Sequence, residues 1–277
     1  MIYICIINSS TNSCAMKKSL FSKIKNVKIV SYDSIPITKN NKYYFMKHIT
    51  PNIINIIKKL RQNNNYIYYE PLDYNWNKFD NIDTYVKEMN KIFIHFNHII
   101  FNNKYMSTLF NNDLQSSCIY HEYDTRYKCG DKTNNIFYIG GLLKCSLTND
   151  IMKKYNIKHI QSCKNNNLHK LSYCGIHINY VLPDKVNYHI HTSTKLSTAI
   201  LFKSIFICNK IPIYLEILGK DYEYYINDDL SNMDNIIKKA LDVLNNNNEY
   251  NLYLSKMNKR KLSPDSIRKS YSKVFNG

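Results

Sequence analysis

A short polar cluster precedes a strongly apolar run in residues 191–207, HTSTKLSTAILFKSIFI. Ser193 and Thr194 supply hydroxyls there, and Lys195 supplies a positive charge. If a helix begins near Thr194, either hydroxyl can cap the first amides, which have no partner inside the helix. The same amides, the helix dipole and the lysine can instead hold a phosphate. The residues alone leave two interpretations open: a capped helix with a solvated lysine, or a cradle for an anionic ligand.

A pair of glycines ends the run IFYIGG at residues 136–141, in a chain with only six glycines. Gly140 and Gly141 allow a tight turn after a buried strand and a close approach of backbone amides to a ligand. A plain turn is the alternative. The sequence has neither G-x-G-x-x-G nor a Walker A pattern here, so it indicates neither a dinucleotide site nor a P-loop NTPase.

Glu216 stands near the end of PIYLEI, residues 212–217, which we expect to form a short buried strand. In an open α/β sheet, ligands bind outside the carboxyl ends of the strands. Glu216 could accept hydrogen bonds from ribose or sugar hydroxyls at that position. A solvated residue at the edge of the fold is the alternative.

Acidic and histidine side chains follow two further strand-like runs, EPLDYNW (70–76) and YHEYDTRYK (120–128). A histidine near carboxylates can act as a general base. We therefore take Asp73, His121 and Asp124 as candidate catalytic residues, with structural hydrogen bonding as the alternative for each. No G-x-S-x-G motif occurs, so a Ser-His-Asp hydrolase is not indicated.

Strands and helices that could position these residues alternate along the chain. Runs rich in Ile, Tyr and Phe, bounded by polar clusters, predict strands; they are 1–7, 27–32, 66–71, 98–102, 117–122, 136–141, 158–163, 176–181, 204–209 and 212–217. Apolar residues at helical spacing, in two cases with Pro at the first turn, predict helices; they are 50–61, 82–94, 104–110, 232–245, 249–257 and 264–275. This alternation predicts α/β layers with mainly parallel sheets.

A change of composition at residues 128–135, KCGDKTNN, marks the best linker. We therefore predict an N-terminal domain over 1–129 and a C-terminal domain over 130–277, each Rossmann-like.

The composition narrows the functional classes. The net charge of +17 favours anionic partners such as nucleic acid or sugar nucleotides. The basic residues are spread along the chain, however, and abundant Lys, Asn, Ile and Tyr are typical of an AT-rich genome, so nucleic acid is not the favoured partner. The eight cysteines form no C-x-x-C pair, which predicts reduced thiols, a cytoplasmic location and no metal site. No apolar run approaches the ~18–20 residues of a membrane span.

The second half resembles the nucleotide-sugar-binding half of GT-B glycosyltransferases. The resemblance rests on FYIGG, on Thr194-Lys195-Leu196 with Ala199, and on the strand SIFICN followed by Pro212 and Glu216. It covers roughly residues 130–277, while 1–129 matches by layout. It implies two Rossmann-like domains facing across a cleft, an acceptor-side first domain, and a C-terminal helix that returns to the first domain.

The resemblance also implies a nucleotide-sugar donor, an unknown acceptor, no separate cofactor and no metal held by a D-x-D motif. The implied donor-binding residues match the motifs by position; they are Gly140, Gly141, Ser193, Thr194, Lys195, Thr198 and Glu216. Two features differ from many retaining members: no pair of glutamates spaced by seven residues occurs here, and NSSTN replaces the usual glycine-rich loop after the first strand. The alternatives are an inactive transferase relative and a non-catalytic basic α/β protein that binds nucleic acid or another polyanion.

Overall fold

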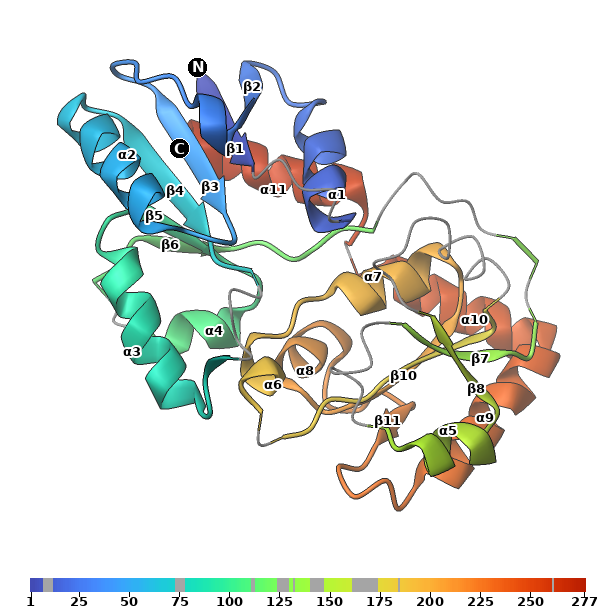
Figure 1. Cartoon of the computed structure of the whole chain (residues 1–277). Helices are drawn as coiled ribbons and strands as arrows, with labels where there is room; N and C mark the ends of the chain where they lie inside the picture. Colours follow the sequence, from blue (N-terminus) through green and yellow to red (C-terminus); the bar gives the residue numbers. More distant parts are fainter. Residues whose placement is uncertain are drawn as a thin grey trace. The chain divides into compact units, whose positions relative to one another are not determined.

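The computed structural model describes residues 1–6, 12–72, 78–110, 113–123, 130, 131, 133–139, 147–160, 174–183, 185–260 and 262–277, with the side chains of 12–15 left out. The chain divides into two compact units, which are described separately (Figure 1). Unit 1 comprises Met1–Tyr120, Lys185–Thr192 and Asp265–Gly277, and unit 2 comprises His121–Asp184 and Ser193–Pro264. Residues 124–129 lie outside the described ranges, so the division at 129 and 130 stays a prediction.

Unit 1 is built on a six-stranded sheet in the order β2-β1-β3-β4-β5-β6, and all its pairs are parallel. Its strands are β1 (Ile2–Ile6), β2 (Val27–Ser31), β3 (Lys42–Met46), β4 (Tyr66–Glu70), β5 (His98–Phe101) and β6 (Ser116–Cys118). Its helices are α1 (Asn12–Phe21), α2 (Pro51–Gln62), α3 (Ile82–Phe93), α4 (Lys104–Thr108), α6 (Val186–Ile190) and α11 (Pro264–Asn276), with a 3-10 turn at Tyr32–Ser34.

Both faces of the unit 1 sheet are buried because helices cover each of them. Successive side chains of a strand point to opposite faces. On β3, Tyr43 and Phe45 join the apolar cluster that includes residues of α2, α3 and α6. Tyr44 and Met46 join the other cluster, with residues of α1 and α11. A parallel sheet covered on both sides explains why these strands are continuous apolar runs.

The C-terminal helix α11 packs on unit 1, as the resemblance predicted. Ile267, Tyr271 and Phe275 are spaced by four residues and are buried in the same cluster as β1 and β3 side chains. The backbone oxygen of Phe275 accepts a hydrogen bond from Lys42 Nζ, and that of Val274 accepts one from Tyr68. Cationic and hydroxyl donors at the last carbonyls stabilise the end of a helix.

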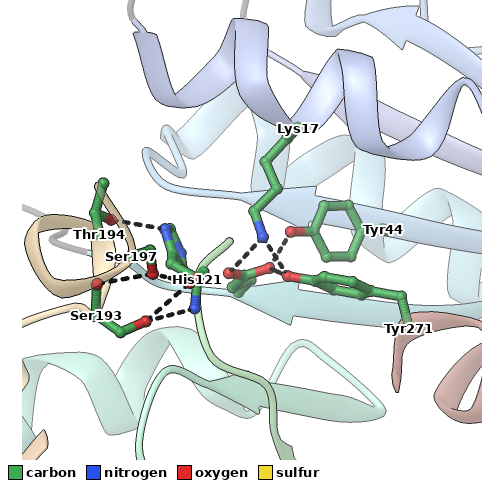
Figure 2. Close-up of polar contacts among 8 residues, drawn as sticks. Lys17, Tyr44, His121, Ser193, Thr194, Ser197 and Tyr271 are labelled. Carbon is green, nitrogen blue, oxygen red and sulfur yellow. Dashed lines mark hydrogen bonds and ion pairs between the residues drawn. The ribbon is translucent and has the colours of Figure 1, made fainter. Parts of the chain in front are cut away.

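A buried polar cluster joins α1, β3, β4 and α11 within unit 1 (Figure 2). Lys17 Nζ lies 3.6 Å from Glu70 Oε1 and donates to the Tyr271 hydroxyl at 2.6 Å. The hydroxyls of Tyr44 and Tyr271 both donate to Glu70 Oε2. Lys17 and Glu70 are at most 1% exposed, so each compensates the charge of the other away from water.

Unit 2 contains a five-stranded sheet in the order β11-β10-β9-β7-β8, again with parallel pairs only. Its strands are β7 (Ile136–Ile139), β8 (Ile157–Ile160), β9 (Ile176–Asn179), β10 (Ile205–Asn209) and β11 (Tyr225–Ile226). Its helices are α5 (Asn149–Lys154), α7 (Thr194–Leu201), α8 (Pro212–Leu218), α9 (Met233–Asn245) and α10 (Asn247–Asn258).

When the strands are numbered within each unit, the order in unit 1 is 2-1-3-4-5-6. The order in unit 2, read from β8 to β11, is 2-1-3-4-5. Both are doubly wound, Rossmann-like arrangements. The predicted α/β class with two Rossmann-like units is therefore confirmed. Among the described residues, no helix is both long and apolar enough to cross a bilayer.

One local prediction was wrong, and some elements were not predicted. Residues 212–217 belong to helix α8 and not to a strand: Pro212 occupies its first turn, and buried Ile213, Tyr214, Ile217 and Leu218 have helical spacing. Strand β3, KYYFM, was overlooked although its tyrosine-rich composition is that of the other strands. Helix α1 was overlooked as well, because its sequence NSCAMKKSLF has no clear apolar stripe.

Candidate functional site

The carboxyl edge of the unit 2 sheet has a topological switch point between β7 and β9. From β7 the chain continues to β8 on one side, and then crosses to β9 on the other side. Connections that leave in opposite directions open a crevice at the carboxyl ends of the two strands, where ligands bind in open α/β sheets. Helix α7 follows β9 in the chain and begins at Thr194.

Lys195, in the first turn of α7, links both strands at this switch point. Its ammonium donates to Asn179 Oδ1 at 2.6 Å and to the Tyr138 hydroxyl at 3.3 Å. The nitrogen also lies 4.5 Å from the centre of the Tyr138 ring, a cation–π distance. Asn179, the last residue of β9, and Tyr138 of β7 are fully buried, so they fix the position of the charge.

Helix α7 begins as predicted, but its hydroxyls do not cap it. Ser193 is the N-cap residue and its side chain makes no capping hydrogen bond. Instead, Ser193 Oγ accepts from the His121 backbone N–H at 2.8 Å and donates to the His121 carbonyl at 3.1 Å. The capping interpretation is therefore wrong for Ser193, because its hydroxyl satisfies the backbone of a distant segment.

Two more hydroxyls of α7 hold the same residue (Figure 2). Ser197 Oγ lies within donating distance of the His121 carbonyl and of the Ser193 carbonyl, the latter at 2.9 Å. Thr194 Oγ1 lies 3.1 Å from His121 Nδ1. Which atom donates in this contact depends on which ring nitrogen of His121 carries the proton.

The structure thus brings together three residues predicted for the site, His121, Ser193 and Thr194, and places Lys195 beside them on the same helix turn. Thr198 is half-buried in α7 and donates to the Thr194 carbonyl at 2.7 Å. Glu216 lies in the second turn of α8 and is half-buried, so it is not at the end of a strand as predicted.

Four predicted site residues fall outside the described part of the chain: Asp73, Asp124, Gly140 and Gly141. Their roles stay predictions. Within the described ranges, no group of three or more His, Cys, Asp or Glu side chains is arranged to hold a metal ion.

The surroundings of Lys195 keep two neighbouring titratable groups neutral. Burial and then the charge of Lys195 lower the pKa of His177 to about 3. Burial raises the pKa of Tyr214, whose hydroxyl is 2.8 Å from Asn179 Nδ2. His177 and Tyr214 are therefore two uncharged neighbours of the Lys195–Asn179 contact.

Three residues of this arrangement were not predicted from the sequence, namely Tyr138, Asn179 and Ser197. A signal existed for Asn179, because it is a polar residue near the carboxyl end of a predicted buried strand. Tyr138 and Ser197 carry no such signal, since tyrosines and serines occur at many core positions of this chain.

No protein-family model matches the sequence, and no curated protein matches it. Solved structures do match over nearly the whole chain. HepE of Anabaena in complex with UDP and glucose has a TM-score of 0.62 at 10% identity, covering 100% of this chain and 99% of that one. HepE with UDP has a TM-score of 0.57 at 8% identity, with 99% of both chains covered.

The N-terminal domain of trehalose-6-phosphate phosphatase from Candida albicans also matches, with a TM-score of 0.57 at 7% identity over 99% of this chain and 96% of that one. Such low identities show the fold alone. The chain has the glycosyltransferase-like, GT-B-like fold that its resemblance predicted.

Proposed function

We propose that this protein is a glycosyltransferase that takes a sugar from a nucleotide-sugar donor, with the donor diphosphate bound at Lys195. The observation that carries the proposal is the position of the Lys195 ammonium at the β7–β9 switch point, fixed by Asn179 and Tyr138. The match along the full chain to a protein solved with UDP and glucose supports the same ligand class.

In the proposed reaction, the bond between the sugar anomeric carbon and the diphosphate oxygen breaks. The nucleoside diphosphate leaves with the electron pair, and an acceptor hydroxyl oxygen forms the new bond to the sugar. The developing negative charge on the leaving group would be stabilised by the Lys195 ammonium and the positive end of α7. Because Lys195 is already held in place, little reorganisation accompanies the reaction.

The proton of the acceptor hydroxyl needs a base. Asp73, His121 and Asp124 remain the proposed candidates, and of these His121 has contacts that can be examined. In the tautomer in which Nδ1 donates to Thr194, His121 Nε2 would accept the proton of the acceptor hydroxyl. The further donor-binding positions that we propose are Gly140, Gly141, Ser193, Thr194, Thr198 and Glu216.

The direct test is titration calorimetry of UDP and GDP against Lys195→Met and a matched control, Lys158→Met. Lys158 has the same kind of contacts in the same sheet, because its Nζ donates to Asn135 Oδ1 at 2.8 Å and lies 5.9 Å from the Phe137 ring centre. Lys158 contacts the residue that precedes β7, however, and so lies away from the carboxyl edge.

We expect the wild type to bind one of the two nucleotides. Lys195→Met should bind that nucleotide at least about tenfold more weakly, a loss of about 1.4 kcal/mol in binding free energy. Lys158→Met should bind it with the affinity of the wild type. Release of nucleoside diphosphate from a panel of nucleotide sugars then tests transfer. If neither nucleotide nor any donor binds, and the protein instead binds single-stranded nucleic acid with a steep salt dependence, the polyanion-binding alternative replaces this proposal.

A further inference from the structure

The amino edge of the unit 1 sheet is formed by the segments that precede its strands. Residues 35–41 precede β3, 63–65 precede β4 and 94–97 precede β5, and these three strands are neighbours in the sheet (Figure 1). Parallel strands begin at the same edge, and neighbouring strands are about 4.8 Å apart. The three segments therefore form one row.

Hydrogen bonds hold the three segments of this row side by side. Asn65 Nδ2 donates to the Thr38 carbonyl at 2.7 Å, which joins the segments before β3 and β4. Arg61 Nη1, from the last turn of α2, donates to the Ile94 carbonyl at 3.1 Å, which joins the segments before β4 and β5. The row is therefore one continuous surface of unit 1.

The exposed apolar side chains of unit 1 lie on this edge. Ile37 is 49% exposed and Ile94 is 65% exposed. Met1, directly before β1, is 59% exposed. Among the described residues, unit 1 has no other large apolar side chain that is exposed. The core does not use these side chains, so only contact with a partner would remove them from water.

The same row is basic. Its segments and the adjoining helix ends, residues 35–41, 58–65 and 91–97, contain no Asp or Glu. They contain five exposed cations, Lys39, Lys58, Lys59, Arg61 and Lys91. Of these five, within the part of the chain that the structure describes, Lys91 alone forms an ion pair, with Glu88 at 2.5 Å. The row therefore carries positive charge that the protein does not compensate.

The two ends of the edge differ in charge. Lys23 and Lys25 precede β2 at one end, and Asp113 precedes β6 at the other end. The excess of positive charge therefore extends from β2 to β5.

The helix dipole explains only part of this arrangement. Cations in the last turn of a helix are stabilised by its dipole, which is a sufficient reason for Arg61 and Lys91. It does not account for Lys39, which lies in no helix, or for exposed isoleucines between the charges.

Cations mixed with aliphatic side chains fit a lipid bilayer better than nucleic acid. Each Lys or Arg near anionic headgroups strengthens binding roughly fivefold. An isoleucine gains by entering the boundary between headgroups and acyl chains. Single-stranded nucleic acid instead uses aromatic side chains on which its bases stack, whereas Met1, Ile37 and Ile94 are aliphatic.

We propose that this edge patch binds the surface of a bilayer that contains anionic phospholipid. The edge patch consists of Ile37, Lys39, Lys58, Lys59, Arg61 and Ile94. The two isoleucines enter below the headgroups, and the cations lie among the lipid phosphates. The edge patch belongs to unit 1 alone and does not depend on the proposed donor site at Lys195.

Sedimentation of the full chain with vesicles tests this proposal. The probes are vesicles of phosphatidylcholine alone, and vesicles of equal parts of phosphatidylcholine and phosphatidylglycerol. We expect the anionic vesicles to bind at least about tenfold more strongly, and this binding to weaken as the salt concentration rises. Equal binding to the two kinds of vesicle, or no binding to the anionic ones, overturns the proposal.

A matched pair of double variants locates the binding. Lys58→Gln with Lys59→Gln should weaken binding to the anionic vesicles at least about tenfold. The control is Lys238→Gln with Lys239→Gln in α9 of unit 2, because both lysine pairs are exposed and follow two isoleucines in a helix. The control should bind as the wild type does. Equal weakening in both double variants would mean that net charge alone attracts the vesicles, which contradicts the edge patch.

A fluorescence experiment tests the insertion of Ile94. The chain has one tryptophan, so Ile94→Trp adds a second indole whose emission should shift to the blue when anionic vesicles are added. Leu252→Trp is the control, because Leu252 is 59% exposed but lies in unit 2, and its emission should not shift. No shift in an Ile94→Trp protein that sediments with the vesicles contradicts the proposal.

Two further measurements separate the alternatives. Binding to single-stranded DNA that is tighter than binding to the anionic vesicles, and that the Lys58→Gln and Lys59→Gln double variant loses, would replace the bilayer by nucleic acid. The same double variant should bind UDP or GDP with the affinity of the wild type. Failure of the edge patch is therefore distinguishable from failure of the donor site.

Discussion

Lys195 Nζ lies 2.6 Å from Asn179 Oδ1, and this contact joins the first turn of α7 to the last residue of β9. It places a positive charge at the switch point of the unit 2 sheet. A neutral amide partner orients the ammonium without cancelling its charge. An aspartate in the same place would both orient it and cancel it.

Asn179→Asp should therefore weaken nucleotide binding at least about tenfold, because the new carboxylate pairs with Lys195 and repels the diphosphate. The measurement is calorimetry with the nucleotide that the wild type binds. Asn135→Asp, which changes the equivalent partner of Lys158, is the control and should leave the affinity unchanged. Equal affinities in the wild type and Asn179→Asp would remove Lys195 from the diphosphate site.

Ser193→Ala should lower the free energy of unfolding by about 1–3 kcal/mol, because buried backbone groups of His121 lose a partner. Thr198→Ala is the control. Its hydroxyl donates to the Thr194 carbonyl inside the same helix, so we expect a smaller loss, below about 1 kcal/mol. Urea denaturation measures the free energy of unfolding of both variants. Equal losses in the two variants would contradict a stabilising role for the hydrogen bonds between Ser193 and the His121 backbone.

His177 should make the protein less stable in acid. Its pKa is lowered from the ordinary 6.5 to about 3, so the unfolded chain takes up a proton below pH 6.5 while the folded chain does not until about pH 3. The free energy of unfolding therefore falls as the pH falls through this window, by up to about 1.4 kcal/mol per pH unit from this residue.

His177→Leu should reduce that slope, as measured by urea denaturation between pH 7 and pH 4. His95→Leu is the control, because burial and the charges of Lys58 and Arg61 also lower the pKa of His95, but it is only half-buried. A slope that is the same in His177→Leu and the wild type is the result that counts against this explanation.

Removing only one partner of the Lys17–Glu70 ion pair should lower the free energy of unfolding more than removing both partners. Glu70→Gln leaves the buried Lys17 ammonium uncompensated, and we expect a loss of about 3–5 kcal/mol in unfolding free energy. The double variant Lys17→Met with Glu70→Gln should lose less than Glu70→Gln alone. A double variant that is the least stable of the set would refute this account of the cluster.

Gly175→Ala should be more destabilising than Gly219→Ala. A Cβ at residue 175 would lie 1.7 Å from the Thr133 backbone oxygen, so the backbone itself must move. A Cβ at residue 219 meets nothing within 4 Å, and the cost there is the strain of its φ of +85°, about 1–3 kcal/mol. Thermal unfolding of the two variants gives the order directly.

The sequence by itself determined the α/β class, nine of the eleven strands that the structure describes, and the start of α7 at Thr194. Those features follow from local composition and period, which neighbouring residues carry. Helix α8 could also have been predicted, because Pro212 at its first turn and the spacing of its four buried residues are helical signals. Its composition, rich in Ile and Tyr, suggested a strand instead.

Only the tertiary structure decided what the polar side chains do. Ser193 was a candidate both for capping its own helix and for binding a donor, and its hydroxyl bonds to the backbone of His121, 72 positions earlier in the chain. Lys195 was predicted at the site, but its partner Tyr138 is 57 positions away. Lys17 pairs with Tyr271 across 254 positions. Hydrogen bonds and ion pairs depend on distances of a few ångströms, and those are set by which strands become neighbours in the sheet, which no local pattern of residues records.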